Sequence, residues 1–262
     1  MTGSYRWYLA RMRLLDAQGR SSWLTYCMNV HPGGTLDATL AAIRETVLPL
    51  KARLGVRGPF GVGLRFDAPT VHALAADAKA RARLRQVLDA DELVPFTGNA
   101  FVLGGFHGGR IKENVYAPTW ADEARGRYTL DFAALLADLL PPGFEASLST
   151  APGGWRPWGH SEELDRAYAA RLERLAEGLE RLESATGRRV RVGLEPQPLC
   201  SIQRVDEANT FFHLRMPEAD RISRHLGVCY DVCHQAVMDE DAGTGLLALE
   251  GAGVSVVKLQ AS

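Results

Sequence analysis

The chain alternates short apolar runs with segments in which apolar residues recur every three or four positions. Continuous apolar runs of this length are typical of buried strands, and the second pattern is typical of helices with one buried face. Strands are predicted at residues 23–30, 59–66, 91–103, 144–150, 190–195, 226–234 and 254–262. Helices are predicted at residues 35–55, 69–88, 129–140, 161–187, 205–226 and 246–251. The pattern therefore predicts a series of β/α units.

Alternating helices and continuously apolar strands favour a parallel sheet that is covered by helices. Seven units in one domain favour a TIM-type (β/α)8 barrel over a doubly wound open sheet. The doubly wound fold would need a GxGxxG turn after an early strand, and the turn after residues 23–30 is HPGGT. The eighth β/α unit of a complete barrel is missing from the sequence. We therefore predict an α/β barrel at residues 23–262, incomplete at its C-terminal end, preceded by an N-terminal arm at residues 1–22.

Composition narrows the range of partners. Of the 262 residues, 46% are hydrophobic and 23% are charged, and the formal net charge is -1. A globular protein of this kind lacks the basic field that attracts nucleic acid or anionic lipid. The apolar runs fall short of the roughly 18 to 20 residues of a membrane span. Cysteines without CxxC pairing and the absence of a secretory signal pattern indicate a cytoplasmic protein with reduced thiols, whose expected partner is a small metabolite.

In a β/α barrel the catalytic groups lie at the C-terminal ends of the strands, and polar residues gather there in this sequence. Glu195 ends an apolar strand, which Pro196 stops because it has no backbone N–H. Asp231 falls near the end of the next strand, so two carboxylates are expected to share a small space and to repel each other. We favour a divalent cation between them over the alternative, an ion-pair network with a basic residue such as Arg65.

Several stretches carry a family resemblance. The sequence VGLEP, followed by VCYDVCH, resembles the xylose isomerase-like barrels, a superfamily of sugar isomerases, sugar-phosphate epimerases and endonuclease IV. Longer stretches, LTYCMNVHPGGTLDATL, PFGVGLRF, GFHGGRIKENVYAPTW and SLSTAP, resemble the EboE family of metabolite traffic proteins, which are encoded in bacterial operons tied to secondary-metabolite export. The likeness extends over residues 23–262.

The resemblance implies a metal site. Glu195 and Asp231 match the metal-binding Glu and Asp of the superfamily, and His234 matches the His beside them, so these three form the implied catalytic set. The usual His of the seventh strand is absent, and Lys258 and Gln260 stand near its place. Gln260 can offer an amide oxygen to Mn²⁺, Mg²⁺ or Zn²⁺, whereas Lys258 would repel the ion or neutralise the acids in its place.

Further residues are candidates for contacting a ligand at the barrel mouth. The predicted ligand-binding residues are His31, His107, Arg110, Lys112, Trp155 and Lys258. Glycines surround His107, with Arg110 and Lys112 close behind, a composition suited to an anionic or hydroxylated ligand. Trp155 adds an aromatic face of the kind that stacks on sugars. The alternatives are a glycine-rich surface turn and, for His31, a role in capping the next helix.

Three functions fit these residues. The first is an enzyme of the sugar isomerase or epimerase type, in which a metal at Glu195 and Asp231 polarises the substrate oxygens while a carboxylate or His234 moves a proton beside a carbonyl. The second is a non-catalytic protein that binds or traffics a metabolite with a degenerate metal site. Phosphodiester cleavage of the endonuclease IV kind is the least favoured, because a trinuclear zinc site needs more histidines and a basic DNA-binding face is missing.

A barrel of seven units leaves its first and last strands each without one neighbour, and unpaired strand edges invite pairing with another chain. We expect the gap between residues 23–30 and 254–262 to be covered in one of three ways. The covers are residues 4–15 of the arm, a second copy of the chain in a homodimer, or residues beyond Ser262.

Overall fold

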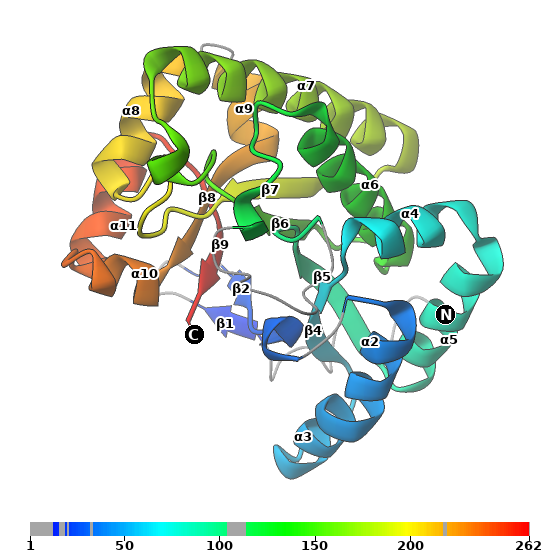
Figure 1. Ribbon diagram of the computed structural model, residues 1–262. Coiled ribbons are helices and arrows are strands. Elements are labelled where there is room, and N and C mark those ends of the chain that lie inside the picture. Colours follow the sequence, from blue (N-terminus) through cyan, green and yellow to red (C-terminus); the bar gives the residue numbers. More distant parts are fainter. Residues whose placement is uncertain are drawn as a thin grey trace.

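The computed structural model of the chain describes residues 13–15, 19, 21–31, 34–103, 114–216 and 219–261. Seven parallel strands form one sheet in the order β3-β4-β5-β6-β7-β8-β9, so each strand pairs with its neighbours in sequence. Helices surround the outer face of this sheet (Figure 1). The topology is that of an open, seven-stranded α/β barrel and confirms the predicted fold class.

The strands of the sheet are short, and most are buried. They are β3 (Tyr26–Cys27), β4 (Phe60–Arg65), β5 (Leu93–Asn99), β6 (Ala146–Thr150), β7 (Val190–Leu194), β8 (Leu226–Asp231) and β9 (Val256–Gln260). A separate antiparallel hairpin consists of β1 (Arg13–Leu15) and β2 (Ser21–Trp23). Every residue of β5 and β8 is buried, as expected for central parallel strands covered on both faces.

The helices follow the strands in alternation. They are α2 (Leu36–Ala42), α3 (Leu48–Arg53), α4 (Ala68–Ala76), α5 (Ala78–Ala90), α6 (Glu123–Leu139), α7 (Glu162–Thr186), α8 (Val205–Arg215), α9 (Ala219–His225), α10 (Val232–Val237) and α11 (Ala242–Gly251). Shorter helical segments are the 3-10 helices η2 (Met28–Val30), η4 (Asn114–Tyr116) and η5 (Arg156–Trp158), and the π-helical segment η3 (Ile43–Val47) between α2 and α3. In the described part of the chain, no helix is both long and apolar enough to cross a membrane.

Lys258 shows how strongly the sheet is curved. Its ammonium group, on β9, donates a hydrogen bond to the backbone carbonyl of Gly98, on β5, across 3.3 Å. In a flat sheet with this strand order, β5 and β9 would lie about 19 Å apart, which no lysine side chain can span. The inner face of the sheet therefore curls round, and side chains of β5, β6 and β9 meet in the barrel interior.

Several element boundaries differ from those predicted by the apolar pattern. The strand expected at residues 23–30 pairs with β4 through only two residues, because Met28–Val30 winds into the 3-10 turn η2. The helix expected at residues 69–88 breaks at Asp77, whose side chain caps the first turn of α5. The strand expected at residues 226–234 stops at Asp231, which caps α10, so His234 lies on a helix. The helix expected at residues 205–226 is divided into α8 and α9.

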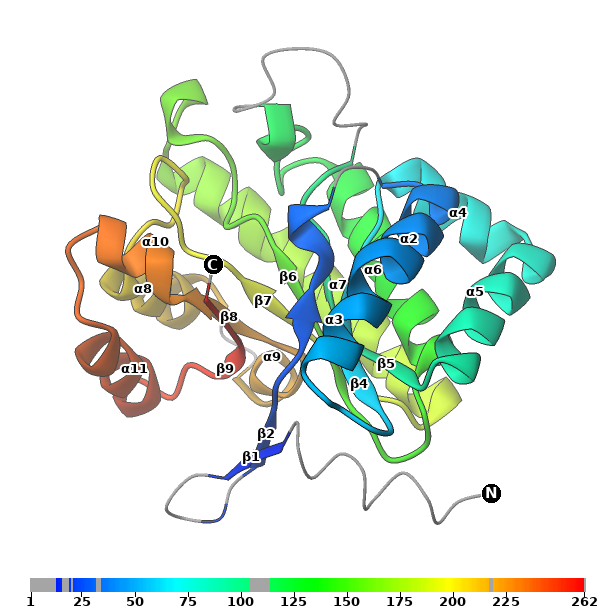
Figure 2. The same cartoon turned by 90° about the horizontal axis from the view of Figure 1, so that it is seen from below.

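The two outer strands of the sheet are β3 and β9, and no strand among the described residues pairs with their free edges. The hairpin of β1 and β2 lies at the end of the sheet where β3 begins (Figure 2). Most of the arm predicted to cover the gap, residues 4–12, lies outside the described residues. Which of the three expected covers closes the gap stays a prediction.

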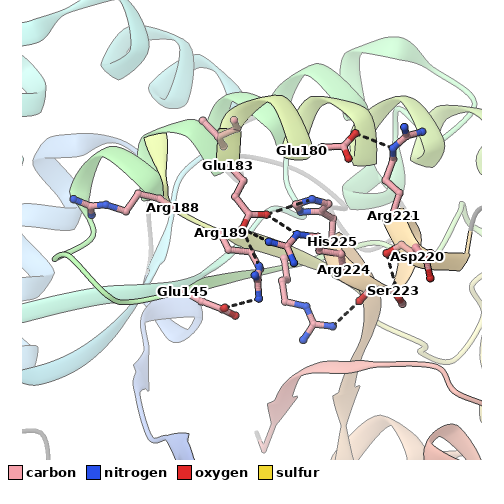
Figure 3. A network of polar contacts seen from close by, with 12 residues as sticks. Glu145, Glu180, Glu183, Arg188, Arg189, Asp220, Arg221, Ser223, Arg224 and His225 are labelled. Carbon is pink, nitrogen blue, oxygen red and sulfur yellow. Dashed lines mark hydrogen bonds and ion pairs between the residues drawn. The ribbon is translucent and has the colours of Figure 1, made fainter. Parts of the chain in front are cut away.

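A polar network fastens the C-terminal part of α7 to the end of the sheet where the strands begin (Figure 3). Glu183 accepts hydrogen bonds from Arg224 at 2.6 Å and from Arg189 at 3.2 Å, and Arg189 also contacts Glu145 at 2.6 Å. His225, the last residue of α9, is fully buried with its Nε2 3.6 Å from Glu183. Arg189 precedes β7 and His225 precedes β8, so the network orders the entry of both strands that carry the candidate site at their other ends.

Candidate metal centre at the barrel mouth

Glu195, Asp231 and His234 come together at the C-terminal end of the sheet. One ligand atom from each residue lies within 4.8 Å of the other two. Nδ1 of His234 is 3.5 Å from Oε1 of Glu195 and 3.9 Å from Oδ2 of Asp231. Within the described part of the chain, no second cluster of three acidic, histidine or cysteine ligands meets the same distance. The fold thus brings together the three residues that the sequence nominated for catalysis.

Glu195 directly follows β7, and the local sequence fixes its place. Its backbone N–H donates to the carbonyl of Thr150 at 3.0 Å, and Pro196 then interrupts the strand because it has no N–H. Gly193 lets β7 and β8 approach closely, since a Cβ atom there would lie 2.5 Å from the backbone nitrogen of Cys229. The strands that carry the two acids are therefore held side by side at the site.

Asp231 is both the last residue of β8 and the N-cap of α10. Its Oδ1 accepts hydrogen bonds from the backbone amides of Cys233 at 2.8 Å and His234 at 3.2 Å. This cap turns the chain from strand to helix within one residue, which brings His234 back toward the acids. Oδ2 of Asp231 is left to face the imidazole and the neighbouring strand β9.

Both carboxylates are shielded from water. The side chains of Glu195 and Asp231 are 3% and 1% exposed, whereas that of His234 is 28% exposed. Burial is the main cause that raises the pKa of Glu195; the charge of Asp231 adds to the rise, and Lys258 and His234 oppose it. Oε2 of Glu195 and Nδ1 of His234 are buried without a hydrogen-bond partner. Two carboxylates and an imidazole with unpaired ligand atoms fit a divalent cation such as Mn²⁺ or Zn²⁺.

Gln260 reaches the two acids from β9. Its Nε2 lies 3.0 Å from Oδ2 of Asp231 and 3.5 Å from Oε1 of Glu195. The amide nitrogen of Gln260 therefore faces the carboxylates, while the amide oxygen of Gln260 is buried without a hydrogen-bond partner. A half-turn of the amide would exchange the two atoms and present the oxygen that a cation needs. The role of Gln260 as a metal ligand stays a prediction.

Lys258 lies two residues before Gln260, on the same side of β9. Its Nζ donates to Oγ of Ser149 at 3.0 Å and to the carbonyl of Gly98 at 3.3 Å. Of the charges near Glu195, that of Lys258 has the largest effect on the pKa of its carboxyl group, which it lowers. The lysine predicted to bind a ligand therefore belongs to the charge balance of the site itself.

Trp155 and His31 make contacts of different kinds. Trp155 stacks on Tyr116 with ring centroids 5.3 Å apart, and the Tyr116 hydroxyl donates to Gln197 at 3.1 Å, in the turn after β7. This chain of contacts links Trp155 to the turn that follows Glu195. Nε2 of His31 lies 2.9 Å from the hydroxyl of Tyr26 on β3, at the opposite edge of the sheet. A ligand-binding role for either residue stays a prediction.

The remaining predicted ligand-binding residues, His107, Arg110 and Lys112, lie outside the described residues. The described chain on either side of them is held by Arg125 of α6, which is fully buried. Its guanidinium group donates to the carbonyls of Phe101 at 3.1 Å, Val115 at 3.2 Å and Pro118 at 2.7 Å. A ligand-binding role for His107, Arg110 and Lys112 stays a prediction.

Three groups at or near the site were not among the predicted residues. Cys229 is fully buried, and its thiol is directed at the carboxylate of Glu195. Its position two residues before Asp231 could have indicated this placement, because alternate residues of a strand share a face. Ser149 holds Lys258, a contact that depends on the curvature of the sheet. Arg125 lies outside the helix predicted at residues 129–140, whereas α6 begins at Glu123, so its buried position in a helix was not foreseen.

No family model matches the chain, and a search of curated proteins finds no match. Among solved structures, the chain is similar to the probable 3-DHS dehydratase AsbF involved in petrobactin synthesis from Bacillus anthracis, with 12% sequence identity and a TM-score of 0.48. The match covers 80% of this chain and 66% of that chain, so the chain spans slightly less than two thirds of the length of that structure. The EboE resemblance stays a prediction, and what the chain does is inferred from its own site.

Proposed function

We propose that the chain binds a small hydroxylated metabolite at the barrel mouth, with a divalent cation held by Glu195 and Asp231 beside His234, and that it catalyses proton transfer beside a carbonyl, as the resemblance to xylose isomerase-like barrels implies. One observation carries the proposal: two buried carboxylates and a partly exposed imidazole converge within 4.8 Å, and two of their ligand atoms are unpaired. Because burying ionised groups without a counter-charge is costly, a cation would offset the repulsion between the acids.

The residues of the cluster would divide the work according to their exposure. A bound cation would polarise a carbonyl or hydroxyl oxygen of the substrate. Glu195 and Asp231, which are shielded from solvent, would hold it. His234 is the member of the cluster that solvent reaches, so we assign it the transfer of the proton to and from the substrate carbon.

A second candidate is a non-catalytic metabolite-binding protein, as the resemblance to the EboE family implies. The observation that favours it lies on β9, which offers the acids an amide donor from Gln260 and a positive charge from Lys258. Neither group, in its present orientation, is a cation ligand. The two candidates differ in whether the folded protein retains a divalent ion.

The deciding experiment is metal analysis of protein purified in the presence of Mn²⁺ or Zn²⁺. We expect about one divalent ion per chain, and its loss from the double variant Glu195→Ala/Asp231→Ala. The matched control removes two exposed acids, Asp37→Ala/Glu162→Ala, whose side chains are 80% and 74% exposed, and should retain the ion. A wild-type protein that is folded by circular dichroism but holds no ion would contradict the enzyme proposal and favour the binding protein.

A further inference from the structure

Strand β9 introduces a fixed positive charge into a site built from acids. Lys258 is part-buried and lies two residues before Gln260 on the same face of β9. The amide of Gln260 contacts both Asp231 and Glu195, so this face of β9 places the lysine beside the acids, and its charge lowers the pKa of Glu195. With Glu195 and Asp231 ionised, the two carboxylates therefore share the barrel interior with one ammonium group. A divalent ion that enters this site gains the attraction of two negative charges but also meets the repulsion of one positive charge.

We propose that Lys258 controls how tightly the cluster of Glu195, Asp231 and His234 binds a divalent cation, by competing with the cation for the two carboxylates. The inference deepens the proposed function and rests on its cation site. It assigns Lys258 a role that differs from ligand contact, since its ammonium group acts on the acids.

The geometry also shows what limits this competition. An ammonium group has three N–H donors. Lys258 uses two of them on groups away from the acids, Oγ of Ser149 at 3.0 Å and the carbonyl of Gly98 at 3.3 Å. Among the described residues, no ion pair of 4.0 Å or less joins Lys258 to Glu195 or Asp231. Ser149 and Gly98 therefore hold the ammonium group on the face of β9 that also carries Gln260, without an ion pair to the acids.

Ser149 is well placed for this tethering role. It is fully buried at the end of β6, and its hydroxyl oxygen accepts hydrogen bonds from both Lys258 and Asn99, the latter at 3.1 Å. Loss of the hydroxyl would leave Lys258 with the carbonyl of Gly98 alone. The ammonium group would then be drawn toward the nearest carboxylates, and the cation would compete with it less successfully.

The test is titration of metal-free protein with Mn²⁺, followed by the electron paramagnetic resonance signal of the free ion, so that no substrate is needed. We expect Lys258→Met to tighten Mn²⁺ binding by about 10-fold or more, because one positive charge leaves the site. Ser149→Ala should weaken binding, and Ser149→Ala should change nothing once it is combined with Lys258→Met. Lys51→Met serves as the control. Lys51 is another part-buried lysine, lies on α3 and donates a hydrogen bond to the backbone carbonyl of Asp91 at 2.7 Å. The Lys51→Met variant should bind Mn²⁺ as the wild type does.

The outcomes separate this inference from the proposed function. Equal Mn²⁺ affinity in the wild type and Lys258→Met would overturn the role of Lys258 and leave the cation site standing. Binding by Lys258→Met alone would support the inference and show that the wild-type site is blocked by its own lysine. No binding by either would overturn both. If Lys258→Met does not fold, Lys258→Gln removes the charge while keeping an N–H donor for Ser149, and the same comparison applies.

Discussion

Gln260 donates its side-chain amide to Oδ2 of Asp231 across 3.0 Å, and the same two residues face each other in the backbone register of β8 and β9. The other oxygen of Asp231 caps α10 through the amides of Cys233 and His234. One buried carboxylate thus joins the last two strands, begins a helix and forms part of the candidate metal centre.

This double engagement gives Asp231 a structural role that can be measured apart from metal binding. We expect Asp231→Ala to lower the free energy of unfolding by about 2–4 kcal/mol, because it removes a helix cap and leaves the amide nitrogen of Gln260 with only its longer contact to Glu195 at 3.5 Å. Asp231→Asn should cost clearly less, since its carbonyl oxygen can cap α10 and the amide of Gln260 can turn to present Oε1. Urea unfolding in the presence of a chelator measures both variants without a contribution from metal. Equal losses from the two substitutions would show that the cap and the amide bond contribute little.

The sequence predicted the architecture because its signals are local. Seven apolar runs and six helical patterns were predicted, and each overlaps a strand or a helix of the structure. Two of the boundary errors fall at Asp77 and Asp231, where a side chain that caps a helix ends an element inside a continuous apolar pattern. Such a cap is a short polar signal, and an average over a longer window conceals it.

The candidate site was predicted only in part, for a related reason. Glu195 and Asp231 end neighbouring strands, so their proximity follows from the order of a parallel sheet. The contact between Lys258 and Ser149 joins strands three places apart and exists only because the sheet is curved. Curvature is a property of the whole sheet and cannot be read from the residues of one strand.

His225 makes the stability of the fold depend on pH. It is fully buried, and burial lowers its pKa below the ordinary 6.5, although Glu183 and the backbone of Val190 act in the opposite direction. The unfolded chain therefore binds this proton more readily than the folded chain, and stability should fall as the pH drops below about 6.5. We expect His225→Gln to show a smaller loss of unfolding free energy between about pH 8 and about pH 5 than the wild type.

The measurement that tests His225 is the change of unfolding free energy with pH, because the substitution also shifts the unfolding free energy by an amount that is the same at every pH. Denaturant unfolding at a series of pH values gives the slope for both proteins. Identical slopes would mean that His225 is protonated as easily in the folded chain as in the unfolded one.

Arg125 is a buried charge that binds described parts of the chain between β5 and α6. Burial lowers its pKa to about 10, so it remains ionised at neutral pH, and its guanidinium group donates to the carbonyls of Phe101, Val115 and Pro118. Arg125→Met should cost about 3–5 kcal/mol, because a fully buried guanidinium group and its bonds to three part-buried carbonyls are lost. Arg125→Lys should cost less, since an ammonium group can still reach part of this set. Arg127, two residues along α6 and 65% exposed, is the control: Arg127→Met should change stability by no more than about 0.5 kcal/mol. Chemical denaturation of the three variants supplies the comparison, and an Arg125→Met protein as stable as Arg127→Met would show that these carbonyls are equally well served by other partners.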